Sequence, residues 1–320
     1  MNRFNEILEK IDKDDKGKFD GVFGLNCLRM KNGRLNFEGD DEGHDMSRFK
    51  NLELNDWAGQ QVCNKIKIPH KYFSRCPNSL KDQNVNEWLP ESEDRVRMRV
   101  KGNVIRGFVS EKYVPLDNKP LVDILAELLD NREIDIKKFD VSERSMHCRI
   151  AFPDLATDVG INGKKDMLHV GVHIQNSEVG SSAVHVYGMV YREICTNGLI
   201  ADAGGEELLN QRHIHIKTYE LKNRAAEAIG NAAKVGSDVI ERLINAQSEA
   251  VIDPMDVIKK LAKDKFTDKF TDEVLSTFQT EPQATKYGIV NAFTSAAKTL
   301  IMDRRVEVER FAGNLLSKNL

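Results

Sequence analysis

The sequence lacks the short motifs that most often name a reaction. It contains no Walker phosphate-binding loop, no glycine fingerprint of a dinucleotide-binding fold and no Gly-x-Ser-x-Gly nucleophile motif. Each of these motifs places backbone amides or a nucleophile at a defined turn, so their absence removes the best-marked nucleotide-dependent and hydrolase classes. The sequence therefore predicts no cofactor and favours a protein that is not an enzyme.

Cysteine and long apolar runs are also scarce. The five cysteines are scattered and none forms a Cys-x-x-Cys pair, which argues against a zinc ribbon and a disulfide framework. We expect reduced thiols, as in a cytosolic protein. The N-terminus is charged and lacks the apolar core of a signal peptide, and no run is long enough to span a membrane. The sequence thus predicts a cytoplasmic protein without a membrane segment.

A strong net charge of either sign is absent as well. Lysine and arginine number 47 against 50 aspartates and glutamates, and the formal net charge is −3. No global field therefore draws the molecule to nucleic acid or to an anionic membrane, and any such contact depends on a local basic patch. Hydrophobic residues make up 40% of the chain, which is typical of a globular protein with a sizeable core.

The sequence does show a hydrophobic periodicity, which changes along the chain. Residues 1–90 combine helical spacing with loop-like sequence, with a helix expected after Asn55 and weak order before it. Residues 91–217 alternate apolar and polar side chains, as strands do, and residues 218–320 return to helical spacing. The sequence predicts an α+β fold with three parts in these ranges: a partly helical module, a twisted antiparallel sheet with packed helices, and a helical C-terminal region.

The strand alternation sorts the side chains of the expected sheet onto two faces. In residues 95–101, Val96, Met98 and Val100 share the apolar face and cations alternate with them. The opposite face collects arginine, histidine and tyrosine, and the one acid at these positions is Glu193. Cations for phosphates beside rings for bases are typical of sheets that bind single strands. We therefore expect these residues to contact nucleic acid: Arg95, Arg97, Arg99, Lys101, Arg149, His169, His173, His185, Tyr187, Tyr191 and Lys217.

Two alternatives to that interpretation remain open. In one, the polar face packs against the long helix expected from residue 219, with tyrosine and methionine in a second core. In the other, His169, His173 and His185 converge on a metal ion, and the protein is a metal-dependent hydrolase. No Asp or Glu stands at matching spacing to complete such a metal site, so nucleic-acid binding is favoured.

Three parts of the chain resemble the phage/plasmid-like protein family, an uncharacterised domain of prophages, phages and conjugative plasmids. The clearest is VHIQNSEVGSSAVHVYGMVYREICTNGLI at residues 172–200, with its Cys-x-Asn-Gly-Leu ending. The others are IRGFVSEKYVPLDN at residues 105–118 and the closing helices KYGIVNAFTSAAKTL and RVEVERFAGNLL. Together they cover the chain from about residue 90 to its end, with gaps.

The resemblance implies a role in a mobile genetic element, but the family has no assigned catalytic residues. A likeness to single-strand annealing recombinases, which place an antiparallel sheet and a helix beside a basic groove, is an analogy of fold alone. We therefore expect a phage- or plasmid-encoded protein that binds single-stranded nucleic acid, with strand annealing as one form of this activity. The rival expectation is a non-enzymatic interaction or assembly protein that acts on a host or phage partner. The sequence leaves open DNA versus RNA and whether the protein is a homo-oligomer.

Overall fold

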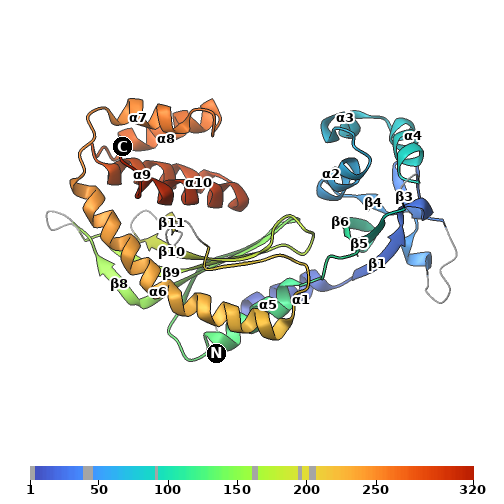
Figure 1. The fold of residues 1–320 in the computed structure, drawn as a ribbon, viewed down its shortest axis with the longest axis horizontal. Helices are drawn as coiled ribbons and strands as arrows, with labels where there is room; N and C mark the ends of the chain where they lie inside the picture. Colours follow the sequence, from blue (N-terminus) through green and yellow to red (C-terminus); the bar gives the residue numbers. More distant parts are fainter. Residues whose placement is uncertain (1–3, 39–45, 91–92, 161–164, 194–196, 202–206) are drawn as a thin grey trace.

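Two lobes make up the molecule in the computed structural model (Figure 1). The structure describes residues 4–38, 46–90, 93–160, 165–193, 197–201 and 207–320. Each lobe is built around its own hydrophobic core. The smaller lobe consists of residues 18–110, and the larger lobe consists of the first helix together with residues 118–320.

The smaller lobe contains a four-stranded sheet in the order β1-β5-β6-β4. A two-stranded hairpin, β2 with β3, and three helices pack around it. In β5 the side chains of Val96, Met98 and Val100 enter the core, as the alternation predicts. The elements are β1 (Lys18–Gly24), η1 (Leu25–Cys27), β2 (Leu28–Lys31), β3 (Arg34–Phe37), η2 (Met46–Phe49), β4 (Glu53–Leu54), α2 (Asp56–Lys65), α3 (His70–Arg75), α4 (Asn78–Trp88), β5 (Arg95–Lys101) and β6 (Val104–Ser110).

The larger lobe contains a six-stranded antiparallel sheet. Five strands follow the order β11-β10-β9-β8-β7, and β12 pairs with the beginning of β10. The strands are β7 (Asp135–Val141), β8 (Met146–Asp158), β9 (Met167–Asn176), β10 (Val184–Arg192), β11 (Asn197–Ala201) and β12 (Leu209–Gln211). The helices are α1 (Asn5–Asp15), α5 (Asn118–Leu128), α6 (Thr218–Ser248), α7 (Pro254–Ala262), α8 (Asp268–Thr280), α9 (Lys286–Ala296), η3 (Ala297–Thr299) and α10 (Met302–Leu315).

Helices cover both faces of the large sheet (Figure 1). The long helix α6 lies against the apolar face, where a Cβ on Gly236 would stand 2.2 Å from a methyl group of Val170. Glycine at this position therefore permits the close approach of α6 to β9. The opposite, polar face lies under α10, and Arg149 of β8 is paired there with Glu309. The helix expected from residue 219 is thus present, but it covers the apolar face and not the polar one.

The predicted α+β class, with antiparallel sheets and a helical C-terminal region, is confirmed. The helix expected after Asn55 is α2, and the Asn55 side chain accepts a hydrogen bond from the amide of Ala58. The prediction that the chain is weakly ordered before this helix is wrong for the described residues, because they form α1, β1, β2 and β3. Within the described ranges, no helix combines the length and apolar character needed to cross a membrane.

Two details of the expected sheet are corrected by the strand pairing. Strands β5 and β6 pair with β1 and β4, and they do not join β7–β12. Alternation specifies which face a side chain occupies but not which strand lies beside it, so this division could not be predicted from the pattern. The strand alternation expected up to residue 217 also fails at its end, in residues 213–217: β12 ends at Gln211, His215 adopts a left-handed conformation with φ 56°, and Lys217 is the N-cap of α6.

Candidate functional site

The polar face of the large sheet is closed off by α10. Arg149 is 2% exposed and its two terminal nitrogens donate to the Glu309 carboxylate at 3.0 and 2.5 Å. Glu309 is fully buried and also accepts a hydrogen bond from Arg305 at 2.8 Å. A buried bidentate pair of this kind holds one helix in one place, because either charge left alone would be costly.

A directed chain of hydrogen bonds continues from Arg149 to the other end of α10. Arg149 Nε donates to His173 Nδ1 at 3.2 Å, and a guanidinium can only donate. The fully buried His173 ring is therefore neutral with its proton on Nε2, which donates to His147 Nδ1 at 3.2 Å. Burial and the positive charge of Arg149 hold the pKa of His173 well below its usual value, which agrees with this assignment.

The chain ends at Asp303, in the first turn of α10. The remaining proton of His147 lies on Nε2 and points to Asp303 Oδ1 at 3.0 Å, and the Ser145 hydroxyl donates to the same oxygen at 2.8 Å. The hydrogen bond from His147 lowers the pKa of Asp303, although burial opposes the shift. Serine and aspartate share one nitrogen of His147 here, whereas a catalytic triad places them on opposite nitrogens. The arrangement therefore differs from a catalytic triad, and its hydrogen bonds join α10 to the sheet.

A glycine of the Cys-x-Asn-Gly-Leu segment leaves room for this network. A Cβ on Gly198 would lie 2.9 Å from Arg149 Nη1 and 3.6 Å from Glu309 Oε1. Two segments that carry the family resemblance, the end of residues 172–200 and the last helix, therefore meet at one buried ion pair. Cys195 of the same segment lies outside the described residues.

An open cleft of about 1050 Å³ lies where the polar face emerges from under α10. Its walls come from α2, from the turn between β7 and β8, and from η3 with the beginning of α10. Six cationic side chains and four acidic ones line it. The cations are Lys138, Arg144, Lys298, Arg304, Arg305 and Arg310, and the acids are Asp140, Glu143, Asp303 and Glu307.

Aromatic rings lie on two sides of this cleft. On the wall formed by α2, the Trp57 indole donates from Nε1 to the carbonyl of Val179 at 3.0 Å, and the Arg144 guanidinium lies 4.7 Å from the indole ring. On the floor, His185 and Tyr187 of β10 stack with their ring centroids 5.3 Å apart. Tyr187 is only 3% exposed and Arg310 lies over its ring, so the cleft offers cations together with an accessible ring, that of Trp57.

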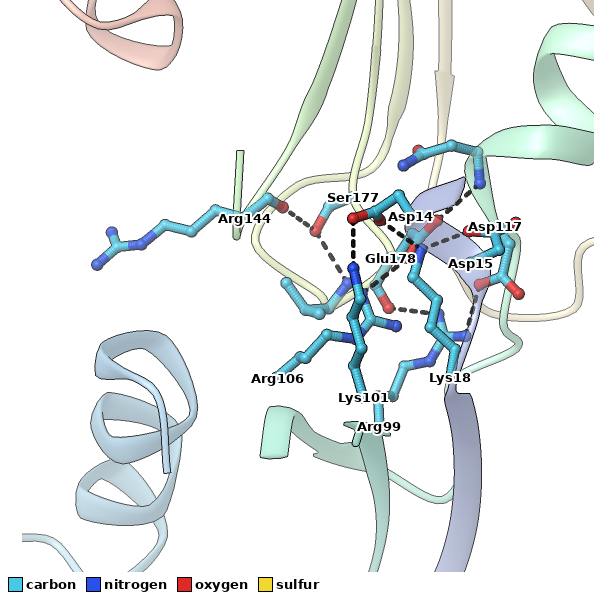
Figure 2. Close-up of polar contacts among 12 residues, drawn as sticks. Asp14, Asp15, Lys18, Arg99, Lys101, Arg106, Asp117, Arg144, Ser177 and Glu178 are labelled. Carbon is cyan, nitrogen blue, oxygen red and sulfur yellow. Dashed lines mark hydrogen bonds and ion pairs between the residues drawn. The ribbon is translucent and has the colours of Figure 1, made fainter. Parts of the chain in front are cut away.

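The loop between β9 and β10 joins the lobes beside the cleft. Figure 2 shows Lys18, Arg106 and Arg99 of the smaller lobe meeting Glu178 in this loop. Lys18 Nζ and Arg106 Nη1 each donate to Glu178 Oε2 at 2.9 Å, and the Asn118 amide donates to Oε1 at 3.0 Å. Burial alone would raise the pKa of Glu178, but these partners, Lys18 above all, lower it below its usual value.

Most residues that the alternation nominated for nucleic-acid contact lie away from the cleft. Arg99 is buried between the lobes, where it donates to Asp20 and Asp117, and Arg149 and His173 are buried under α10. The two that line the cleft are His185 and Tyr187. Most of the others contact a partner outside the cleft: Arg95 pairs with Glu111, Lys101 with Asp14 and Lys217 with Glu220, His169 lies near Glu193, and the ring of Tyr191 lies under Lys137. Arg97 is a partly buried residue of β5.

The alternation missed most of the cleft because its residues come from a turn and from helix beginnings. Trp57, Arg144, Lys298 and Arg304 do not alternate with apolar neighbours in a strand. The adjacent pair Arg304-Arg305, which lies in the first turn of α10, is a signal in the sequence that could have pointed to this surface.

The three histidines of the metal interpretation have different neighbours. His173 contacts Arg149 and His147, His185 pairs with Glu207 at 2.8 Å, and His169 lies 3.5 Å from Glu193. In the part of the chain that the structure describes, no group of three His, Cys, Asp or Glu side chains is placed to hold a metal ion. Among the described residues, His169, His173 and His185 therefore do not form the shared site that the metal interpretation expects.

Comparisons with known proteins place the chain in a family without assigning an activity. Neither the curated proteins nor the solved structures gave a match. A family model matches residues 106–312, from β6 to α10, and so includes the large sheet, the loop at Glu178 and every residue that lines the cleft except Trp57. Because this match spans more than half of the chain, the protein belongs to the family described as a domain of unknown function, DUF932.

Proposed function

We propose that this protein binds single-stranded nucleic acid in the cleft between its lobes. The observation that carries the proposal is the gathering of cations and rings from separate elements around one open cleft. Lys138, Lys298 and Arg304 are exposed there and can reach phosphates, and the partly buried Trp57 provides a ring face. Nonspecific single-strand binders use this combination of a basic groove and stacking rings.

The cleft carries more cations than acids although the whole chain has a negative net charge, and this local excess of positive charge supports the proposal. Six cations face four acids in the cleft, whereas the whole chain has a net charge of −3. Asp303 is also engaged by His147 and Ser145, which reduces the competition that its carboxylate offers to a phosphate. The proposed contact surface thus moves from the strand face to the cleft, with His185 and Tyr187 common to both.

The proposed biological setting is a phage or plasmid, where the protein would bind or anneal single strands during replication or recombination. This part of the proposal rests on the three stretches that resemble the phage/plasmid-like family, and on the antiparallel sheet with a helix beside a basic groove. A strand-annealing assay with complementary labelled oligonucleotides separates annealing from simple binding.

The binding itself is tested by fluorescence anisotropy with labelled DNA and RNA oligonucleotides at about 50 mM and about 200 mM salt. Three phosphate contacts, from Lys138, Lys298 and Arg304, predict that affinity for a single strand falls by about tenfold to twentyfold between these salt concentrations. No binding of either oligonucleotide at the lower salt would contradict the proposal. A preference between the two oligonucleotides identifies the natural ligand.

A second candidate function, a non-enzymatic interaction protein, is favoured by apolar side chains that protrude from the C-terminal region. Ile252, in the loop after α6, is fully exposed and Ile301, before α10, is 73% exposed. Exposed apolar side chains mark contacts between proteins where they gather into one patch. Light scattering after gel filtration tests this candidate: a defined oligomer that ignores oligonucleotides and dissociates in Ile252→Ser or Ile301→Ser supports it. A monomer that binds oligonucleotides argues against it.

A further inference from the structure

We infer that an unpaired base stacks on the Trp57 indole, and that this contact makes the cleft select single strands over duplexes. The inference rests on the proposed function and adds a residue that determines specificity. Trp57 lies before the part of the chain that the family model matches, so the resemblance does not nominate it.

The indole is held in a fixed position at the cleft wall. Trp57 is in the first turn of α2, which Asn55 caps, and its Nε1 donates to the Val179 carbonyl at 3.0 Å. Gln61, one turn further along α2, donates to the same carbonyl at 2.9 Å and accepts a hydrogen bond from the amide of Phe108. A ring that is already immobile loses little conformational entropy when a ligand stacks on it.

One face of this ring already carries a planar cation. The Arg144 guanidinium lies 4.7 Å from the centre of the indole, and both side chains line the cleft. Guanidinium groups and nucleobases are both planar and stack on the same aromatic faces. The position of Arg144 therefore marks where a base can lie.

Arg144 is held there by contacts that a ligand can replace. Its ion pair with Asp56, at 2.9 Å, joins side chains that are 41% and 64% exposed, and exposed pairs are weak in water. A base that takes the place of the guanidinium over Trp57 keeps the ring covered. The displaced guanidinium remains in the cleft and can pair with the phosphate next to that base.

The stacking contact distinguishes single strands from duplexes, whereas the cationic side chains do not. Lys138, Lys298 and Arg304 interact with phosphates, which single strands and duplexes both present. A base inside a duplex is stacked on its neighbours and must be flipped out before it can cover a protein ring, which costs free energy. Trp57 thus favours the unpaired strand.

The chain has two tryptophans, and the second is a natural control. Trp88, on α4, is 50% exposed and is not among the residues that line the cleft. In Trp88→Phe the remaining fluorescence comes from Trp57, so we expect quenching when a single-stranded oligonucleotide is titrated in. In Trp57→Phe the remaining fluorescence comes from Trp88, and we expect it to stay unchanged.

Affinities for single-stranded and duplex DNA of the same length then test the specificity. We expect Trp57→Leu to weaken single-strand binding by about tenfold. Trp57→Phe should retain part of the affinity, and duplex binding should change less than about twofold in both variants, because the phosphate contacts remain. An equal loss for single strand and duplex, or no loss for either, would overturn the inference.

If Trp57→Leu does not fold, an experiment with the wild-type protein still tests the inference. An abasic strand of the same length keeps the phosphates and lacks the bases, so we expect it to bind about tenfold more weakly than the normal strand. Equal binding of the two strands, or equal binding of poly-glutamate, overturns the inference while leaving a polyanion-binding cleft in place. If the wild-type protein binds no nucleic acid at low salt, the proposed function itself fails.

Discussion

At the scale of single residues, buried charges decide which surfaces of this protein are available to a ligand. Arg149 looks like a phosphate contact in the sequence because it alternates with apolar neighbours in a strand. In the structure its guanidinium is saturated by Glu309 and His173. These partners lie 24 and 160 positions away in the sequence, and no local pattern reports them.

The Arg149–Glu309 pair makes a stability prediction. Glu309→Gln leaves a buried guanidinium without its counter-charge, so we expect the free energy of unfolding in urea to fall by about 3–5 kcal/mol. Glu307→Gln, two positions earlier, removes an exposed pair with Arg304 and should cost less than about 1 kcal/mol. A similar loss of unfolding free energy in the two variants would show that the buried pair stabilises the protein no more than the exposed pair does.

His213 makes a prediction about pH. Its ring is stacked on Tyr113 with centroids 4.8 Å apart, and burial lowers its pKa to about 4. In the unfolded chain the pKa is about 6.5, so the unfolded state binds a proton between these values and the folded state does not. Stability is therefore complete above about pH 6.5 and falls as the pH drops towards 4.

Urea unfolding at several pH values checks this prediction. Each such histidine contributes a slope of up to about 1.4 kcal/mol per pH unit within that window. His213→Phe keeps a ring on Tyr113 and removes the titrating group, so the pH dependence should become shallower, with the remainder coming from groups such as His173. An unchanged slope in His213→Phe would contradict the assignment.

At the scale of helices and strands, local periodicity predicts the elements, whereas contacts distant in sequence decide their neighbours. The alternation in β5, β6 and β8–β10 and the apolar stripe of α6 follow from side chains at local spacing, and these elements are confirmed. The pairing of β5 with β1 and the choice of α10 as cover for the polar face depend on distant segments. The same limit applies to the cleft, of which strand alternation found His185 and Tyr187 but not the walls.

Two glycines of α6 provide a matched test of how this helix packs. At Gly236 a Cβ would lie 2.2 Å from Val170, so Gly236→Ala should push α6 off the sheet and destabilise the protein by about 1–3 kcal/mol. At Gly230 a Cβ would meet nothing within 4 Å, so Gly230→Ala should stabilise the protein by about 0.5–1 kcal/mol through helix propensity. Thermal or urea unfolding gives both signs, and stabilisation by Gly236→Ala would contradict the packing of α6 on β9.

At the scale of the whole molecule, the contacts around Glu178 connect the smaller lobe, which carries Trp57, to the larger lobe, which forms the rest of the cleft. Lys18, Arg106 and Arg99 come from the smaller lobe, and the loop that carries Glu178 belongs to the larger lobe. Trp57 is attached to the same loop through the carbonyl of Val179. The loop at Glu178 thus joins the lobes beside the cleft, together with pairs such as Arg144–Asp56.

Glu178→Gln should loosen that junction, because Lys18 and Arg106 lose their shared carboxylate. We expect a larger maximum dimension in small-angle X-ray scattering and faster amide exchange in residues 176–182. Glu127→Gln removes an exposed pair with Lys222 in the larger lobe and serves as the control, with no change expected in either measurement. Identical scattering curves for wild type and Glu178→Gln would show that the lobes are held together by other contacts.

The most direct test of the central claim, that the cleft is the binding site, is a pair of matched charge reversals in the anisotropy assay. Lys138→Glu with Lys298→Glu places two acids in the cleft and should weaken single-strand binding by at least about tenfold. Lys259→Glu with Lys269→Glu makes the same change in net charge on the exposed surfaces of α7 and α8, and should leave the affinity within about twofold. An equal loss of affinity in the two double variants, or a loss only in the second, would contradict the assignment of the cleft as the nucleic-acid site.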